Sequence, residues 1–457
     1  MSDHDTAYLT AGQLGQLYQQ RELSPVLVVN QLLARIERLN GELNAFVVVD
    51  RERALEATRL SEQRFARGEA LGPLDGVPVS VKDLLPVRGV PTRRGSRTSS
   101  ELASDEDAPA VARLREAGAI IFAKTTTSEF GLKGAGDSPL TGITRNPYAL
   151  AHTPGGSSAG AVVAVAAGFG PIAIGTDGGG SIRVPSAYTG VLGLKPTFGR
   201  VAQHPPSFVG VPAHVGPIAR SVSDLALVLR TIAAPDARDP LRAPLDQPFP
   251  AEPALGGLRI GFAETFANAA VDPEIAQAFA RAIGALREQG VQLSQVEPDF
   301  VPSLSILRTL FAARAAATVR TLSDEQRGQL DPAVESAARE GEQLSAVAYL
   351  VAEEQRIELL ENVARHFQRF DLLLTPSTAY TAPAIAGATP ARGEQTPFTY
   401  PFSLTRQPAL SLPIGQTAAG LPIGLQIVGR HFEDERVLSL ATRLESLFPF
   451  RAPALTT

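Results

Sequence analysis

The stretch GGSSAGAVVAVAAGFGPIAIGTDGGGSIR, residues 155–183, decides how the rest of the chain is interpreted. It opens with two glycines and two serines, continues through small apolar residues, and ends in three glycines followed by Ser181. Glycine is placed where the backbone takes unusual angles or approaches another group closely. A glycine cluster that ends in a hydroxyl predicts backbone N–H groups around a nucleophile, a geometry that can hold an oxyanion.

Other interpretations of this stretch compete with that one. Glycine-rich turns also occur without a chemical role, and serine is common in turns. The G-x-x-x-x-G-K-[ST] pattern of phosphate loops and the G-x-G-x-x-G spacing of dinucleotide-binding folds are both absent from the stretch. The apolar run is too short and too rich in glycine to span a membrane, and its small residues fit a closely packed helix.

A second motif lies upstream, in LDGVPVSVKDL at residues 74–84, where alternating valines predict a strand that ends at Lys82. A lysine in this position is usually a surface charge. A buried lysine loses its proton more readily, because burial disfavours the ammonium form. A neutral amine can then act as the base for a serine, and Ser–Lys pairs are known variants of the serine triad.

Together these motifs resemble the amidase signature family. The resemblance rests on GGSSAG, on GTDGGGSIRVPSA at residues 175–187, and on the spacing of Lys82, Ser157 and Ser181. It covers nearly the whole chain, with a weaker middle from about 236 to 370. Further similar segments are GAIIFAKTTTSEFG (118–131), RNPY (145–148), GLKPTFGRV (193–201), GPIARSVSDLAL (216–227), FDLLLTPSTAYTAP (370–383) and GLPIGLQIVGR (420–430).

The resemblance implies a role for each signature residue. The catalytic residues would be Ser181 as nucleophile, Ser157, expected to follow a cis peptide bond, as proton relay, and Lys82 as base. The oxyanion hole would be formed by the N–H groups of Gly178, Gly179, Gly180 and Ser181. The supporting residues would be Asp177, Arg183 and Ser158.

Six further residues are predicted to line the substrate pocket, although each also fits ordinary packing. They lie next to the SEFG element, in the Pro/Gly-rich loop 197–217, and near the C-terminus: Gly131, Leu132, Arg200, Phe208, Tyr380 and Phe402. Arg200 has an alternative role, the pairing with a nearby acid. The apolar character of the set favours a small, largely uncharged amide, anilide or carbamate.

Three departures from the usual family pattern bear on the substrate. Gly178 stands where a threonine or an apolar residue is common, which loosens the oxyanion loop or makes room for a larger substrate. Ala159 replaces a glycine of GGSSGG. Arg406 and Gln407 stand where small residues are common. The usual acyl-group preference of the family is therefore not assumed for this chain.

Composition narrows the possible functions. The 457 residues carry a net charge of −5, which argues against a nucleic-acid-binding surface. The chain has no cysteine, so disulfides and thiol chemistry are excluded. None of the six histidines is paired at metal-ligand spacing, and neither a metal nor a cofactor is expected. The first residues lack the basic start and apolar segment of a signal peptide, and no stretch suggests a membrane span, so a cytoplasmic location is expected. The expected oligomeric state is a monomer or a homodimer.

Strands that alternate with helices through the signature region predict an α/β fold. The resemblance implies the amidase signature fold, with a large central mixed β-sheet covered by helices on both faces. It also implies one domain over residues 1–457, with a helical cap-like region at roughly 300–370. Downstream strands are expected at residues 258–262, 291–296, 372–374, 410–413 and 423–428, and helices at 274–289 and 345–370.

The function implied by the resemblance is a serine hydrolase that cleaves the C–N bond of small amides, anilides or carbamates (urethanes) through an acyl-enzyme. One alternative is the amidase subunit of a tRNA-dependent amidotransferase, but the chain lacks a clear RNA-binding charge. Another is a non-catalytic scaffold of the same fold, against which the intact Lys82, Ser157 and Ser181 count. The expected partner is a small-molecule substrate rather than a nucleic acid or a membrane.

Overall fold

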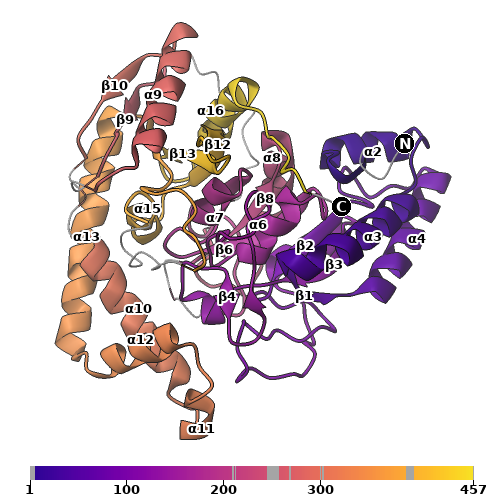
Figure 1. The fold of residues 1–457 in the computed structure, drawn as a ribbon, viewed down its shortest axis with the longest axis horizontal. Coiled ribbons are helices and arrows are strands. Elements are labelled where there is room, and N and C mark those ends of the chain that lie inside the picture. Colours follow the sequence, from indigo (N-terminus) through magenta and orange to yellow (C-terminus); the bar gives the residue numbers. More distant parts are fainter. Residues whose placement is uncertain are drawn as a thin grey trace.

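A mixed sheet of eleven strands forms the centre of the computed structural model, which describes residues 6–207, 210, 213–243, 257–266, 269–298, 300, 303–386 and 396–455 (Figure 1). The strand order is β1-β3-β2-β6-β8-β7-β12-β13-β11-β9-β10. The strands are β1 (Phe46–Val49), β2 (Pro78–Lys82), β3 (Ile120–Thr125), β6 (Ile172–Asp177), β7 (Leu192–Lys195), β8 (His214–Ala219), β9 (Ile260–Phe262), β10 (Leu293–Gln295), β11 (Leu372–Pro376), β12 (Ala409–Gln416) and β13 (Pro422–Gly429). A separate pair, β4 (Asp137–Ser138) and β5 (Gly142–Ile143), lies outside this sheet.

Helices cover both faces of the sheet, as the sequence predicts. The helices that pack on the strands or on one another are α2 (Ala11–Gln19), α3 (Pro25–Leu43), α4 (Arg51–Arg67), α5 (Pro109–Glu116), α6 (Ala159–Ala166), α7 (Arg183–Tyr188), α8 (Val222–Ile232), α9 (Pro273–Glu288), α15 (Tyr400–Leu404) and α16 (Asp434–Leu447). Side chains alternate between the faces of a strand. Ile172 and Ile174 of β6 belong to the apolar cluster that also contains residues of α5, α8, α9 and α16, whereas Ala173 belongs to the cluster that contains residues of α3 and α6.

Local sequence signals set the boundaries of several helices. Ser24 caps α3, because its hydroxyl accepts the N–H groups of Val26 and Leu27. Pro25 occupies the first helical position, where its missing N–H costs nothing. The run of small residues after the Gly-Gly-Ser-Ser turn forms α6, which is buried along its whole length. That helix is the closely packed one that the sequence indicated.

Strand β8 corrects the prediction that residues 197–217 form one continuous loop. The last residues of this segment, from His214 onwards, pair in antiparallel fashion with β6. Pro217 lies opposite Ile174 in this pairing. Proline cannot donate to a sheet ladder, so a segment that contains it suggests a loop from sequence alone.

The region from α10 to α13 extends away from the sheet, along the left and lower edges of Figure 1. It consists of α10 (Ser303–Val319), α11 (Asp324–Arg327), α12 (Pro332–Glu342) and α13 (Ala346–Arg369). Its apolar side chains pack with those of α15 and with Leu373, Ala409 and Val428 of the sheet. Among the described residues, no helix combines the length and apolar character needed to cross a bilayer.

Candidate active site

The carboxyl ends of β2 and β6 form the base of the candidate site. The two strands are parallel neighbours, with Val79 opposite Ile172, so both end at the same edge of the sheet. Ligands of such sheets bind beyond the carboxyl ends of the strands. Lys82 is the last residue of β2, and Thr176 and Asp177 are the last two of β6. The fold therefore places the predicted base beside the strand that leads into the glycine loop.

The Lys82 side chain is fully buried and contacts three hydroxyl groups. Its Nζ lies 2.8 Å from Ser157 Oγ, 2.9 Å from Ser158 Oγ and 2.9 Å from Thr176 Oγ1. Burial lowers the pKa of Lys82 well below its ordinary value, whereas the negative charge of Asp177 acts in the opposite direction. The site thus favours the neutral amine, the form that can accept a proton.

The hydrogen-bond pattern excludes Ser158 as a proton donor to the neutral lysine. The Ser158 hydroxyl donates its single proton to the carbonyl oxygen of Thr176, 3.1 Å away. Ser158 Oγ therefore accepts an N–H of Lys82. The other two hydroxyl groups within hydrogen-bond distance of the lysine nitrogen, and so near the lone pair of a neutral amine, are those of Ser157 and Thr176.

The Gly-Gly-Ser-Ser turn holds Ser157 against the lysine. The peptide bond between Gly156 and Ser157 is cis, as the family resemblance implies. A side chain at Gly156 would collide with the carbonyl oxygen of Ala135, so glycine is required there. The Ser158 N–H donates to the carbonyl oxygen of Ser181, 3.1 Å away, and this bond joins the two ends of the signature stretch.

Asp177 and Arg183 form a buried ion pair beneath the glycine loop, with 2.9 Å between Arg183 Nη2 and Asp177 Oδ1. The same carboxylate accepts the main-chain N–H groups of Gly180, Ile182 and Arg183. Burial alone would raise the pKa of Asp177, but the charge and hydrogen bonds of Arg183 outweigh burial and lower it. These contacts fit the supporting roles predicted for both residues.

The four N–H groups predicted for the oxyanion hole divide into two kinds. Within the described chain, those of Gly178, Gly179 and Ser181 donate to no other residue. The Gly180 N–H instead donates to Asp177 Oδ1 at 2.7 Å, so it is already engaged and we exclude it from the hole. The sequence does not reveal this difference, because it depends on which way each peptide group faces.

A small pocket opens at the two signature serines. Ser157, Ser181, Gly178 and Thr176 line it, and its cavity volume is about 30 Å³. The loop predicted to line the substrate entrance supplies several of the other lining residues. Those others are Leu84, Leu85, Arg94, Gly131, Gln203, Pro205, Pro206, Ser207 and Phe311.

Comparison with known proteins identifies the family. The family model described as Amidase matches residues 27–438. The chain belongs to the amidase signature family. It is 35% identical to an acylamidase of Rhodococcus erythropolis over 98% of both chains, and 34% identical to a glutamyl-tRNA(Gln) amidotransferase subunit of Symbiobacterium thermophilum over 98% of this chain and 99% of that one. The solved structure of a bacterial aryl acylamidase of the family superposes with a TM-score of 0.89 at 28% identity, covering 97% of each chain.

Two residues to which the sequence analysis gave no role contribute to the candidate catalytic pocket of this amidase. Thr176 contacts the lysine, and the signal that could have revealed it is its place at the end of a strand parallel to β2. Arg94 also lines the pocket. Its backbone is held in position, because the Arg94 N–H donates to the carbonyl oxygen of Asp83 at 3.1 Å. Asp83 in turn pairs with the buried Lys124 at 2.9 Å.

Gly131 lines the catalytic pocket, as the sequence predicts. Its φ is +72°, in the left-handed region that favours glycine. A Cβ at this position would lie 2.9 Å from Leu84 Cδ1 and 3.3 Å from Ser157 Oγ. Glycine at this position therefore leaves room for the Ser157 hydroxyl, the predicted proton relay.

A Gly131→Ala variant is expected to lower kcat/KM, because its Cβ would crowd Ser157 Oγ and move it slightly, and catalysis depends on the exact position of its groups. Gly142→Ala is the matched control, since Gly142 also has a φ of +72° but has nothing within 4 Å of its Cβ position. Melting temperatures measure the strain that both variants share, and kcat/KM measures crowding at Ser157. Equal losses of kcat/KM in the two variants would contradict the crowding.

Arg200 lies in a buried ion-pair network rather than in the catalytic pocket. Its Nη2 is 3.3 Å from Asp434 and 3.4 Å from Glu435, both on α16. It also donates to the carbonyl oxygen of Phe432 at 3.0 Å. Of the two roles considered for this arginine, the structure shows the pairing with acids. Its partners are distant in sequence, so the loop alone gave no sign of them.

The remaining predicted pocket residues do not line the catalytic pocket in the described chain. Leu132 borders a neighbouring hollow beside α10 and α12. Tyr380 and Phe402 pack in the apolar cluster under α10 and α13, where the Phe402 ring lies 5.8 Å from that of Phe300. Phe208 lies outside the described residues.

A second buried lysine, Lys195, is not placed to act as the base. Its Nζ donates to the carbonyl oxygens of Pro196, at 3.2 Å, and Gln407. Burial lowers its pKa as well, and Arg183 adds to this effect. Lys195 does not border the pocket of Ser181. Gln407, one of the departures from the family pattern, thus accepts a hydrogen bond from a structural lysine.

Proposed function

We propose that the chain is a serine hydrolase that cleaves the C–N bond of small amides and anilides. The observation that carries this proposal is the 2.8 Å contact between Lys82 Nζ and Ser157 Oγ, in the pocket that also contains Ser181. Burial lowers the pKa of the lysine and favours the neutral amine, which can receive a proton. The acylamidase relatives support amides and anilides as the substrate class.

In the proposed mechanism, neutral Lys82 takes the hydroxyl proton of Ser157, and Ser157 takes that of Ser181. Ser181 Oγ then attacks the substrate carbonyl carbon. The C–N bond breaks as the proton returns through Ser157 to the departing nitrogen, which leaves an acyl-enzyme on Ser181. Water enters, gives its proton to the same relay, and releases the acid while restoring the Ser181 hydroxyl.

The N–H groups of Gly178, Gly179 and Ser181 are proposed to bind the oxyanion of each tetrahedral intermediate. One such donor contributes about 3–4 kcal/mol in a comparable serine enzyme. Asp177 and Arg183 would act by fixing the loop that carries these groups, since Asp177 accepts main-chain N–H groups of the loop, Arg183 holds Asp177, and neither residue lines the pocket. The helical region at roughly 300–370 is proposed as a cap, because Phe311 of α10 borders the pocket.

Carbamates and glutamine define two further candidate substrate classes. A carbamate presents the same carbonyl carbon to Ser181, so the mechanism extends to it without a new group. The 34% identity to a glutamyl-tRNA(Gln) amidotransferase subunit favours glutamine hydrolysis within a larger complex as the alternative. The net charge of −5 counts against a tRNA-binding surface on this chain.

The test is a hydrolysis screen of the purified chain alone against anilides, primary amides, carbamates and glutamine. We expect the highest kcat/KM for anilides or other amides. Turnover of glutamine that requires added partner subunits would replace the proposal with the amidotransferase alternative. If the chain shows no turnover and does not react with a serine-directed probe, a non-catalytic scaffold is favoured.

A further inference from the structure

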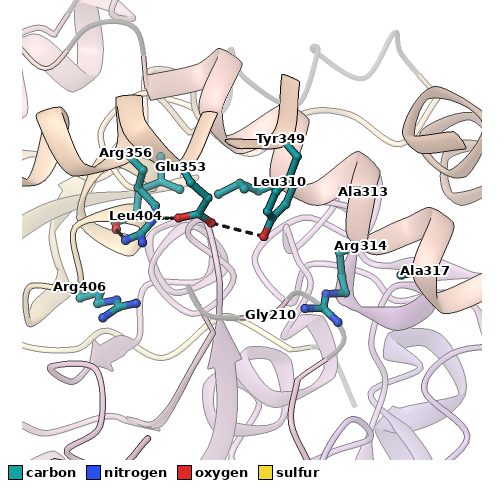
Figure 2. A pocket seen from close by; sticks show the side chains of 10 residues that line it. All are labelled: Gly210, Leu310, Ala313, Arg314, Ala317, Tyr349, Glu353, Arg356, Leu404 and Arg406. Carbon is teal, nitrogen blue, oxygen red and sulfur yellow. Dashed lines mark hydrogen bonds and ion pairs between the residues drawn. The ribbon is translucent and has the colours of Figure 1, made fainter. Parts of the chain in front are cut away.

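A second pocket, which we call the arginine pocket, lies between α10, α13 and α15 (Figure 2). Its cavity volume is about 230 Å³, which is several times larger than that of the catalytic pocket. Its lining combines three arginines and one glutamate with apolar side chains. The lining residues are Gly210, Leu310, Ala313, Arg314, Ala317, Tyr349, Glu353, Arg356, Leu404 and Arg406.

The charges of the arginine pocket do not balance. Glu353 is its one carboxylate, and this group already pairs with Arg356 at 2.8 Å and accepts the Tyr349 hydroxyl at 3.5 Å. Within the described chain, Arg314 and Arg406 are in no ion pair, and Figure 2 shows both guanidinium groups pointing to the space beside Gly210. The pocket therefore presents two positive charges that an anion can neutralise.

The Arg406 guanidinium is held in place before any ligand binds. It lies over the ring of Phe198, 4.5 Å from the centroid, in a cation–π contact. Its backbone has a φ of 71°, which is uncommon for a residue other than glycine. Burial lowers the pKa of Arg406, and the nearby charge of Arg356 adds to this effect. A bound anion would offset that repulsion.

The apolar walls of the pocket indicate the kind of molecule to which the anionic group belongs. Leu310, Ala313 and Ala317 of α10 and the side chain of Leu404 of α15 supply apolar walls, while the Leu404 carbonyl oxygen accepts a hydrogen bond from Arg356. Planar guanidinium groups suit carboxylates, to which they can donate two parallel hydrogen bonds. An organic carboxylate on an alkyl or aryl body matches both features better than a small inorganic anion does.

The arginine pocket is close to the catalytic pocket. Ser207 lines the catalytic pocket, Gly210 lines the arginine pocket, and the Gly210 N–H donates to the carbonyl oxygen of Ser207 at 3.1 Å. A hydrogen-bonded turn keeps its ends within about 7 Å. On α10, the adjacent residues Phe311 and Leu310 likewise border one pocket each.

We propose that the arginine pocket binds a carboxylate at the remote end of the amide substrate, while the scissile bond lies at Ser181. This inference rests on the function proposed above and makes its substrate class more specific: amides that carry a carboxylate on an apolar chain or ring. It replaces the expectation of a largely uncharged substrate. It also gives a role to Arg406, which departs from the usual pattern of the family.

The experiment compares each carboxylate substrate with its own methyl ester. One pair carries the group on the acyl side, as the monoanilide of glutaric acid, and the other on the amine side, as acetanilide with a para carboxylate. We expect the wild-type chain to prefer the acid in at least one pair. Arg406→Gln, alone or with Arg314→Gln, is expected to lower the acid-to-ester ratio of kcat/KM roughly 10- to 100-fold. Arg406→Lys, which keeps the charge, is expected to retain part of the preference.

Arg339→Gln is the matched control, since this exposed arginine belongs to the same helical region but pairs with Glu335 outside the pocket. Its acid-to-ester ratio is expected to equal that of the wild type. Melting temperatures show whether each variant is folded. An unchanged ratio in the folded Arg314→Gln/Arg406→Gln variant would overturn the proposal.

Calorimetric titration with free glutarate and benzoate separates the pocket from the catalysis. Binding that is lost in the double variant, together with a changed substrate ratio, supports the proposal. Binding that is lost without a change in the ratio assigns the pocket to a free acid and overturns its assignment to the substrate. If no amide is hydrolysed and Ser181 reacts with no probe, the proposed function fails, whereas an absence of binding in an active enzyme refutes only the arginine pocket.

Discussion

A Ser181→Ala variant is expected to lose all labelling by a fluorophosphonate and nearly all turnover. In a comparable serine enzyme, removal of the nucleophile lowers kcat by a factor of about a million. The expectation rests on the position of Ser181, which lines the same pocket as Ser157 and follows a glycine loop in which the N–H groups of Gly178 and Gly179 donate to no other residue within the described chain. Peptide mapping of the labelled wild-type chain measures the site directly.

Ser186→Ala provides the matched control for this experiment. Ser186 lies on α7, shortly after the nucleophile, and its buried hydroxyl has no hydrogen-bond partner among the described residues. It does not line the catalytic pocket, so its loss is expected to leave labelling intact. An adduct on Ser157 or Ser158, or labelling that survives in Ser181→Ala, would contradict the assignment of the nucleophile.

The fold was largely predictable because the core strands are short segments in which apolar residues either alternate with polar residues or follow one another without interruption. The strand ending at Lys82 and the strand at the end of the signature run were both expected, and their parallel pairing explains how the base and the serines meet. Strand β8 escaped prediction, because Pro217 suggests a loop. Its neighbours β6 and β7 supply the pairing that a single sequence cannot show.

The candidate site was predictable where short motifs fix the backbone, and less so where the partners are distant. The three residues proposed to be catalytic, Lys82, Ser157 and Ser181, were indicated by the signature and by the strand that ends at the lysine. Which N–H groups serve the oxyanion was not, because the engagement of Gly180 by Asp177 depends on peptide orientation. Arg200 was predicted to line the pocket because of its charge and its position in the loop. The acidic residues with which it pairs lie on α16, far along the chain.

Activity is expected to rise with pH, because the mechanism uses neutral Lys82. Burial lowers the pKa of this lysine in the folded chain, and only the deprotonated amine can take the serine proton. Below the lowered pKa the amine is charged and kcat/KM falls; above it the rate reaches a plateau. Lys82→Ala is expected to lose several orders of magnitude in kcat/KM, together with this ascending limb, while remaining folded. Near-normal turnover in the variant, or an acidic optimum in the wild type, would exclude Lys82 as the base.

The same lysine gives the stability of the chain a pH dependence of defined sign. Between the lowered folded pKa and the ordinary pKa of about 10.4, the unfolded chain binds a proton at Lys82 that the folded chain does not. The free energy of unfolding therefore rises with pH across this window. Lys82→Met removes this contribution, so the variant is expected to gain less stability than the wild type between neutral and alkaline pH. Urea denaturation at several pH values measures the difference, and identical slopes would show that Lys82 remains protonated in the folded chain.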